Sequence, residues 1–251
     1  MIVKLPRLRY FEFNATTSLS PGSWNGNLLL ELPVKLKSIS LIMPDRVICN
    51  VLPVLLERLT ELKELSILCR ESPNLTDLSK LILPLSLSNL TTLSVAGCTR
   101  ITAQPLLLLL EGISDSLSDL SLEALGLVQH SFWAAAAPSC KNLKHLKITH
   151  PGSSNDKGFV ASLIVLLKSI TSLESFTIYH SGNIQENGIT IWPVLNPEDL
   201  EDIGKSSPNL RKFFCSGVLL NEAGVKRISE NMPELNDLVI HIEEDLELVS
   251  Y

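Results

Sequence analysis

The side chains that could act as nucleophiles, general bases or metal ligands are scattered along this chain. Its 251 residues include five cysteines and five histidines, and no two cysteines form a Cys-x-x-Cys pair. His145 and His150 stand five residues apart, a spacing that does not place them on one helix face. The motifs of serine hydrolases, phosphate-binding loops, dinucleotide-binding loops and zinc peptidases do not occur. The sequence therefore predicts no enzymatic activity, no cofactor and no metal.

The cysteines are odd in number and widely spaced, a pattern typical of free thiols in a reducing compartment. Cys98, in the segment LSVAGCTRIT, follows an alternating apolar run, where packing is favoured over reactivity. The N-terminal segment MIVKLPRLRYFEF carries charges throughout, unlike a secretory signal. The longest apolar run, PLLLLLEGI, is shorter than a membrane span. We therefore expect a cytoplasmic or nuclear protein that has no membrane partner.

The charge balance argues against nucleic acid as a partner. The formal net charge is −6 at pH 7, and no stretch of the chain gathers a block of lysine and arginine. Binding to the phosphate backbone requires clustered positive charge. A protein partner is therefore the expectation.

The elements that must position these side chains come from one repeated phrase, LxxLxL, in which Ile, Val, Phe or Cys replaces some leucines. The copies are Leu8-Phe11-Phe13, Leu36-Ile39-Leu41, Leu62-Leu65-Ile67, Leu90-Leu93-Val95, Leu117-Leu120-Leu122, Leu143-Leu146-Ile148, Leu173-Phe176-Ile178, Leu210-Phe213-Cys215 and Leu235-Leu238-Ile240. The eight intervals between Leu8 and Leu235 average about 28 residues. Alternate side chains of a strand share a face, so the last two residues of each phrase point into one interior.

The segments between the phrases have helical spacing. In residues 155–170, Phe159, Leu163 and Leu167 share one helical face, and further helices are expected in 131–138, 197–208 and 221–233. A single strand cannot bury its apolar face, whereas stacked copies form a continuous core. The pattern predicts an α/β right-handed solenoid, shaped as a horseshoe, with a parallel inner sheet, outer helices and about eight to nine repeats.

We expect one domain over residues 1–251, without a linker that divides it. The first repeat, near residues 5–13, is degenerate. The interval from Leu173 to Leu210 is 37 residues long, which predicts an insertion near 181–205 that contains Trp192. This insertion is either a surface elaboration or a binding loop. The acidic tail, residues 242–251, has two interpretations. It is a solvated end or a cap over the last strand, or else it is a binding segment.

The segment LTTLSVAGCTRITAQPLLLLL, from Leu90 onward, resembles the cysteine-containing leucine-rich repeat LxxLxLxxCxxIT. That repeat type is best known from F-box proteins, and the loose repeats look similar to divergent fungal F-box repeat proteins. In that family an F-box binds the Skp adaptor of a ubiquitin ligase, and the repeats recruit the substrate. The repeats of this chain begin by Leu5, so an F-box is lacking, and a Skp adaptor is implied only if the full gene product contains one.

The resemblance implies a protein-interaction module, the substrate-recognition repeats of an F-box-like SCF ubiquitin ligase receptor. The alternative is a stand-alone leucine-rich repeat scaffold or regulator without a ubiquitin role. Repeat proteins usually bind through the concave sheet, and exposed aromatic residues beside cations are typical interface anchors. The C-terminal half of that face is therefore the predicted protein-binding site, although these side chains could equally be ordinary surface residues. Its predicted residues are His145, Lys147, Thr177, Tyr179, Trp192, Lys212, Phe214 and Ser216.

Overall fold

The computed structural model describes most of the repeat region. The described residues are 5–14, 27–43, 52, 54–69, 87–98, 102–123, 125, 130–150, 157–180, 184–186, 189–191, 195, 197–216 and 222–241. The predicted acidic tail, residues 242–251, lies outside this set, as does most of the segment between β9 and the following helix.

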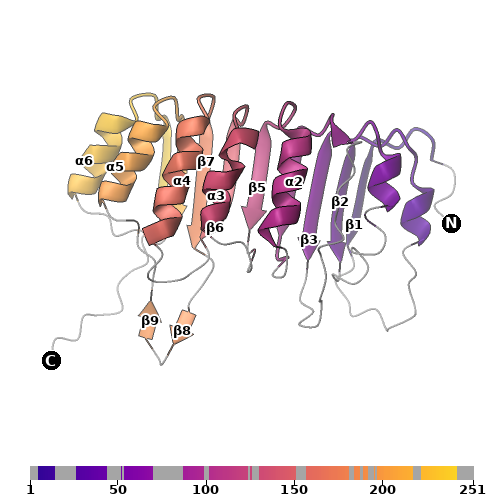
Figure 1. Ribbon diagram of the computed structural model, residues 1–251, viewed down its shortest axis with the longest axis horizontal. Coiled ribbons are helices and arrows are strands. Elements are labelled where there is room, and N and C mark those ends of the chain that lie inside the picture. The colour runs from indigo at the N-terminus through magenta and orange to yellow at the C-terminus, as the bar shows by residue number, and fades with distance from the viewer. Residues whose placement is uncertain are drawn as a thin grey trace.

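Within the described residues, nine parallel strands form one open sheet, and their spatial order follows the chain (Figure 1). The strands are β1 (Tyr10–Asn14), β2 (Ser38–Met43), β3 (Glu64–Cys69), β4 (Thr92–Ala96), β5 (Asp119–Glu123), β6 (His145–His150), β7 (Ser175–His180), β10 (Lys212–Ser216) and β11 (Asp237–His241). Each strand coincides with one predicted repeat phrase. The register places equivalent residues side by side, as with Leu65 and Leu93 on β3 and β4.

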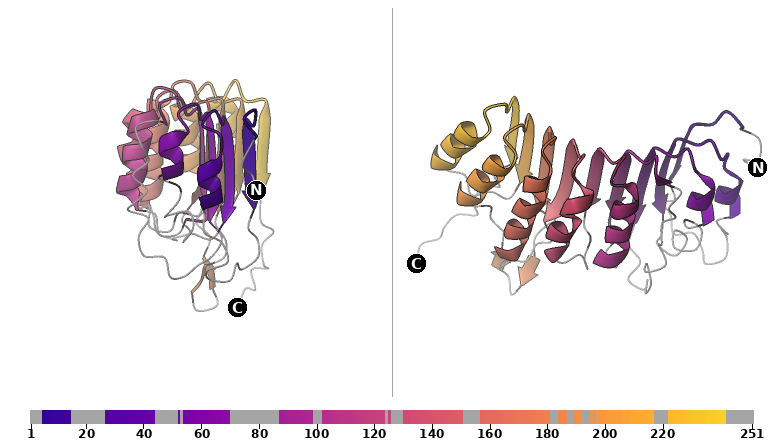
Figure 2. Two further views of the ribbon diagram at one scale, coloured as in Figure 1. Left: turned by 90° about the vertical axis from the view of Figure 1, so that its right-hand side faces the viewer. Right: turned by 45° about the horizontal axis from the view of Figure 1, so that its top comes forward.

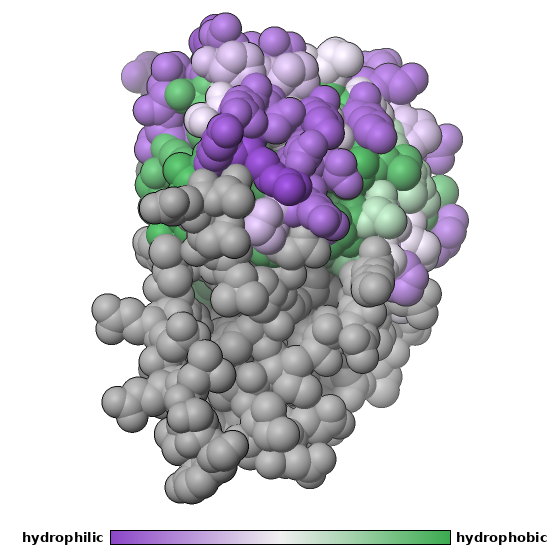
Figure 3. Space-filling model, turned by 90° about the vertical axis from the view of Figure 1, so that its left-hand side faces the viewer, coloured by the Kyte–Doolittle hydropathy of each residue, from purple (hydrophilic) through white to green (hydrophobic). Residues whose placement is uncertain are grey.

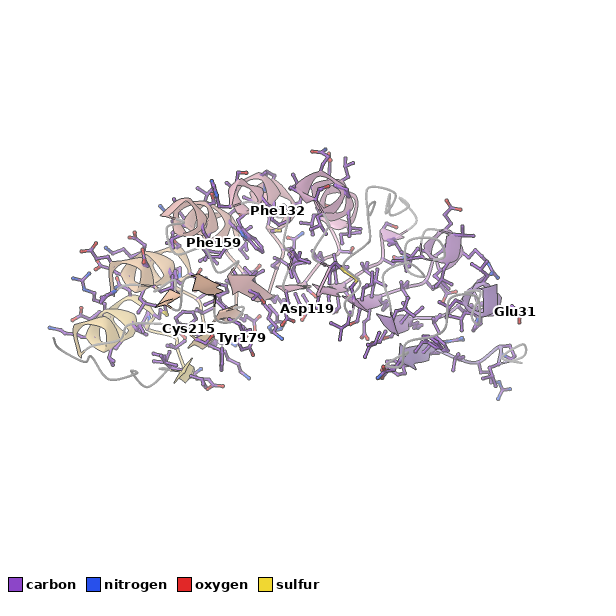
Figure 4. All side chains as sticks on the ribbon, turned by 90° about the horizontal axis from the view of Figure 1, so that it is seen from below. Glu31, Asp119, Phe132, Phe159, Tyr179 and Cys215 are labelled. Carbon is purple, nitrogen blue, oxygen red and sulfur yellow. A yellow bond between two sulfur atoms is a disulfide. The ribbon has the colours of Figure 1, made fainter. Side chains whose placement is uncertain are left out.

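The helices all cover one face of the sheet (Figure 2). They are η1 (Asn27–Glu31), α2 (Ala103–Ile113), α3 (Ser131–Ala136), η4 (Ala137–Ser139), α4 (Lys157–Ser169), α5 (Pro197–Ser206) and α6 (Glu222–Asn231), together with helical residues 54–58. Viewed from below, the sheet lines the inner side of an arc and the helices its outer side (Figure 4). The predicted solenoid, with nine repeat strands, is confirmed.

The predicted insertion contains a short antiparallel hairpin, β8 (Ile184–Glu186) and β9 (Ile189–Ile191), which projects below the nine-stranded sheet in Figure 1. Trp192 follows this hairpin and lies outside the described residues. The extent of the single domain over residues 1–251 stays a prediction.

The core lies between the sheet and the helices and is built from the repeat anchors. On β4, Leu93 is 0% exposed and Val95 is 4% exposed, whereas Thr92, Ser94 and Ala96 on the opposite face are half-buried. Each fully buried leucine stabilises the fold by roughly 1.5–3 kcal/mol. The copies stack because none of them could bury its apolar residues without a neighbour.

The start of each strand is held by a regular backbone ladder. The carbonyl oxygen of Lys63, just before β3, accepts hydrogen bonds from the backbone N–H groups of Thr91 at 2.8 Å and Thr92 at 3.0 Å. The same pair of hydrogen bonds, from two consecutive N–H groups to one carbonyl of the preceding repeat, recurs between all neighbouring strands from β1 to β11. The accepting carbonyls run from Arg9 to Arg211. Asparagine side chains reinforce this ladder, because Asn89 and Asn209, each just before an anchor leucine, donate to backbone carbonyls of the preceding repeat. The recurrent Asn-Leu pairs in the sequence thus join neighbouring repeats.

The cysteine prediction is wrong for two residues, because Cys69 and Cys98 form a disulfide with their Cα atoms 5.2 Å apart. Cys69 ends β3 and Cys98 follows β4, one repeat later. Gly97, the residue before Cys98, has a positive φ of +69°. A Cβ at Gly97 would overlap the carbonyl oxygen of Cys69, so only glycine fits here. Glycine at this position thus lets the backbone after β4 pass close to the end of β3.

Candidate functional site

The concave face of the sheet carries the side chains that alternate with the buried anchors. Neighbouring strands are parallel and in register, so these side chains form rows that cross the sheet. Seven of the eight predicted binding residues lie on this face: His145 and Lys212 in the first row, Lys147, Thr177 and Phe214 in the second, and Tyr179 and Ser216 in the third. The position of the eighth, Trp192, stays a prediction.

Two aromatic rings meet in the C-terminal part of this face. The ring centroids of Tyr179 on β7 and Phe214 on β10 are 4.7 Å apart, and both side chains are half-buried. Val239 on β11 lies opposite Phe214 and is 38% exposed. We call Lys147, Tyr179, Phe214 and Val239 the aromatic patch. Figure 4 shows Tyr179 on the inner side of the arc, where a partner can reach it.

Lys147 contacts both an aromatic ring of this patch and an acidic side chain in the middle of the concave face. Its Nζ atom lies 5.0 Å from the centroid of the Tyr179 ring and 2.9 Å from a carboxylate oxygen of Glu123 on β5. Ser121 also donates a hydrogen bond to that carboxylate, at 2.9 Å. A cation held over an aromatic ring in this way is attracted to the negative face of the ring. The ammonium group is therefore positioned before any partner arrives.

Beside the patch, the middle of the concave face contains an open hollow of about 180 Å³. Its walls are rich in hydroxyl groups and are formed by Thr92, Leu93, Ser94, Asp119, Leu120, Ser121, His145, Leu146, Lys147, Ser175 and Thr177. His145 and Asp119, two of these lining residues, are register neighbours on β6 and β5, with Nε2 and Oδ1 3.9 Å apart. Pockets that bind drug-sized ligands are generally larger than this. The hollow has the size to accept individual side chains of a partner.

The structure adds residues that the sequence-based prediction of the site left out. Glu123 orients Lys147, Asp119 faces His145, and Val239 extends the aromatic patch. All three occupy positions that alternate with buried anchors, and that signal was present in the sequence. Their contacts depend on which residues of neighbouring strands lie side by side.

The described residues offer little other chemistry. Within them, no group of three or more histidine, cysteine and acidic side chains could hold a metal ion. Burial raises the pKa of the Cys140 thiol and of the Cys215 thiol to about 12, so both are protonated and unreactive near neutral pH. No helix in the described part of the chain is long and apolar enough to cross a bilayer.

Comparison with known proteins supports the fold and nothing narrower. No protein-family model matches the sequence, and no curated protein matches it either. The leucine-rich repeat protein LegL7 from Legionella pneumophila aligns over 92% of this chain and 90% of its own, with 12% identity and a TM-score of 0.46. TLR13, in a complex with the single-stranded RNA ssRNA13, aligns over 96% of this chain with 13% identity and a TM-score of 0.52. This chain spans 33% of TLR13.

Sequence periodicity, the nine-stranded parallel sheet with helices on one face of the described chain, and the similarity to TLR13 agree. The chain has the fold of a leucine-rich repeat solenoid.

Proposed function

We propose that this chain is a protein-interaction module that binds its partner on the concave face, with the aromatic patch as the anchor. The observation that carries the proposal is the half-buried Tyr179–Phe214 pair, with Lys147 held over the tyrosine ring. Large aromatic residues next to a cation supply most of the binding energy in many interfaces, because they bury much area at a small entropic cost.

The charges of this face suit a protein better than a nucleic acid. Although TLR13 was solved with single-stranded RNA, the central cation here, Lys147, is already paired with Glu123, and Asp119 lies beside His145. Phosphate backbones require unpaired positive charge along a path. A mixed surface of hydroxyl, acidic, basic and aromatic groups is instead typical of protein interfaces.

A narrower form of the proposal makes the chain the substrate-recognition repeats of an F-box-like ubiquitin ligase receptor, working in the cytoplasm or nucleus. Its support is the resemblance of the Leu90 repeat to the cysteine-containing repeat type. The alternative is a stand-alone repeat scaffold or regulator. The Cys69–Cys98 disulfide favours this alternative, because disulfides persist mainly in oxidising compartments, where a ubiquitin ligase does not act.

A site-directed crosslinking experiment tests the proposal. A photo-crosslinking amino acid replaces Thr177, which lies between Lys147 and Phe214 in the second row. The control carries it at Val165, which lies on α4 and is 49% exposed. We expect the partner to crosslink from position 177 and not from 165. Equal crosslinking from both positions would contradict a concave-face site.

The partner found in this way is then purified and titrated against the double variant Tyr179→Ala with Phe214→Ala. We expect the partner's Kd to rise at least about tenfold, as it does when central interface anchors are truncated. The melting temperature should change little, since neither side chain belongs to the core between sheet and helices. An unchanged Kd would refute the aromatic patch as anchor. Direct binding of the purified Skp adaptor to the intact gene product distinguishes the ligase receptor from the stand-alone scaffold.

A further inference from the structure

The two ends of the solenoid leave residues of the core type uncovered. In the middle of the sheet, the inward anchors Leu93 and Leu120 are 0% and 3% exposed. Leu238, the equivalent anchor on the last strand β11, is 38% exposed. Phe11 and Phe13 on the first strand β1 are only partly buried, and their rings stack on each other at 6.5 Å. Each end thus presents the apolar surface that a neighbouring repeat covers elsewhere.

Among the described residues, the ladder of backbone hydrogen bonds is also open at both ends. Asn236 and Asp237 donate to the carbonyl of Arg211 at 2.9 and 3.0 Å, and no described residue donates in turn to the carbonyl of Asn236. At the other end, no described carbonyl accepts from the N–H groups of Arg9 and Tyr10. An unpaired strand edge of this kind is a template for another parallel strand. The C-terminal edge supplies the acceptor that the N-terminal edge lacks.

The two edges have complementary charge when their repeat phrases are aligned. Arg7 occupies in the first phrase the position that Glu234 occupies in the last, and Leu8 corresponds in the same way to Leu235. Arg7 and Glu234 are both exposed. Stacking one end on the other would place this arginine and this glutamate side by side. The exposed Arg9 and Asp237 would lie one position apart.

The apolar side chains match in the same alignment. Leu238 would lie beside Phe11, and Ile240 beside Phe13, as Phe176 lies beside Phe213 inside the sheet with ring centroids 5.7 Å apart. Figure 3 looks onto the C-terminal end, where hydrophobic residues reach the surface on either side of a hydrophilic band. In the left view of Figure 2, the N-terminal end faces the reader, with β1 at the near edge of the sheet.

We propose that β11 of one copy binds β1 of a second copy in parallel, so that the sheet continues from one molecule into the next. The contact is heterologous, because it joins two different surfaces. It leaves one open edge at each end of the pair, and longer head-to-tail series form as the concentration rises. The contact is made by the strand edges and by anchors such as Leu238, so the proposal does not depend on the aromatic patch, although β11 also carries Val239 of that patch.

Charge reversal tests the contact in the 251-residue chain. The variants Glu234→Arg and Arg7→Glu each place like charges at the junction, and sedimentation velocity over a wide concentration range measures assembly. We expect the unmodified chain to form dimers and higher species as concentration rises, and each variant to need at least about tenfold more protein to do so. An equal mixture of the two variants restores opposite charges at the junction and should regain assembly.

A second pair of variants tests the apolar part of the contact. Leu238→Lys places a charge at the junction and should weaken assembly, whereas Val165→Lys, on the outer face of α4 and comparably exposed at 49%, should not. Circular dichroism confirms that each variant is folded. The proposal is overturned if the unmodified chain sediments as a monomer at every concentration. It is also overturned if the variants assemble as the unmodified chain does, or if the mixture stays monomeric.

Discussion

At the residue scale, the segment from Leu93 to Cys98 shows how neighbouring positions take different roles. Leu93 and Val95 belong to the core, Ser94 and Ala96 to the concave face, and Gly97 to a turn that only glycine can make. Cys98 is 2% exposed and bonded to Cys69, so packing and crosslinking account for it. It has no part in the binding face.

Alkylation tests the disulfide. The denatured chain should take up three alkyl groups without reductant and five after reduction, because Cys69 and Cys98 are bonded and the sequence contains five cysteines. Intact mass spectrometry counts the groups. In the folded protein, Cys140 and Cys215 should react slowly, since both are buried and their pKa of about 12 leaves almost no thiolate. Five groups without reductant would show that the bond is absent.

At the element scale, the neighbouring outer helices α5 and α6 are held together by an ion pair as well as by packing. Glu201 on α5 accepts hydrogen bonds from Lys205 of the same helix and from Arg227 of α6, the latter at 2.7 Å. The hydrogen bond from Lys205 is the main cause of the lowered pKa of Glu201, and Arg227 lowers it further. This pair of helices closes the C-terminal end of the outer layer.

The lowered pKa of Glu201 predicts a specific pH dependence. A carboxyl group whose pKa is lower in the folded than in the unfolded chain stabilises the fold above its unfolded pKa. That contribution is lost as the pH falls through the folded value. Glu201→Gln should therefore lower the free energy of unfolding at neutral pH and have little effect once the pH lies below the folded pKa of the carboxyl group.

Urea denaturation of Glu201→Gln and of the unmodified chain, from neutral pH down to below the folded pKa of Glu201, measures the difference in their free energies of unfolding. Glu230→Gln is the matched control, because Glu230 pairs with Lys226 of the same helix, α6, at 3.7 Å. An exposed pair within one helix contributes little. If the free energy of unfolding differed by the same amount at all pH values between Glu201→Gln and the unmodified chain, the ionised Glu201 carboxylate would not be the source of the stabilisation.

At the scale of the whole molecule, the open sheet makes stability uneven along the solenoid. Central strands such as β4 and β5 have a neighbour on each side and buried anchors. Among the strands that the structure describes, β11 pairs with β10 alone, and Leu238 on it is exposed. Repeat arrays derive their stability from each repeat and its nearest neighbours. The terminal strands should therefore open first.

Hydrogen exchange measures this gradient. At low protein concentration, the amides of β4 to β7 should exchange more slowly than those of β11, because local opening is cheapest where few apolar contacts are lost. Raising the concentration should slow exchange at β1 and β11 selectively if copies associate end to end. Equal protection along all nine strands would show instead that the solenoid opens as one unit.

The sequence alone was sufficient for the repeat, the strand positions and the inward anchors. Each anchor phrase carries its own periodicity, and only stacking can bury it, so local residues determined the solenoid. The same alternation placed Tyr179 and Phe214 on the concave face. These predictions needed only the spacing within a repeat.

Tertiary structure decided which residues of different repeats meet. Tyr179 contacts Phe214 across the longest interval in the chain, Lys147 lies between Glu123 and Tyr179, and Cys98 is bonded to Cys69 of the preceding repeat. Repeats of unequal length leave these pairings open until the strand register is known. The physical reason is that burial is set by periodicity within one strand, whereas contacts on the face and at the strand ends depend on register between strands.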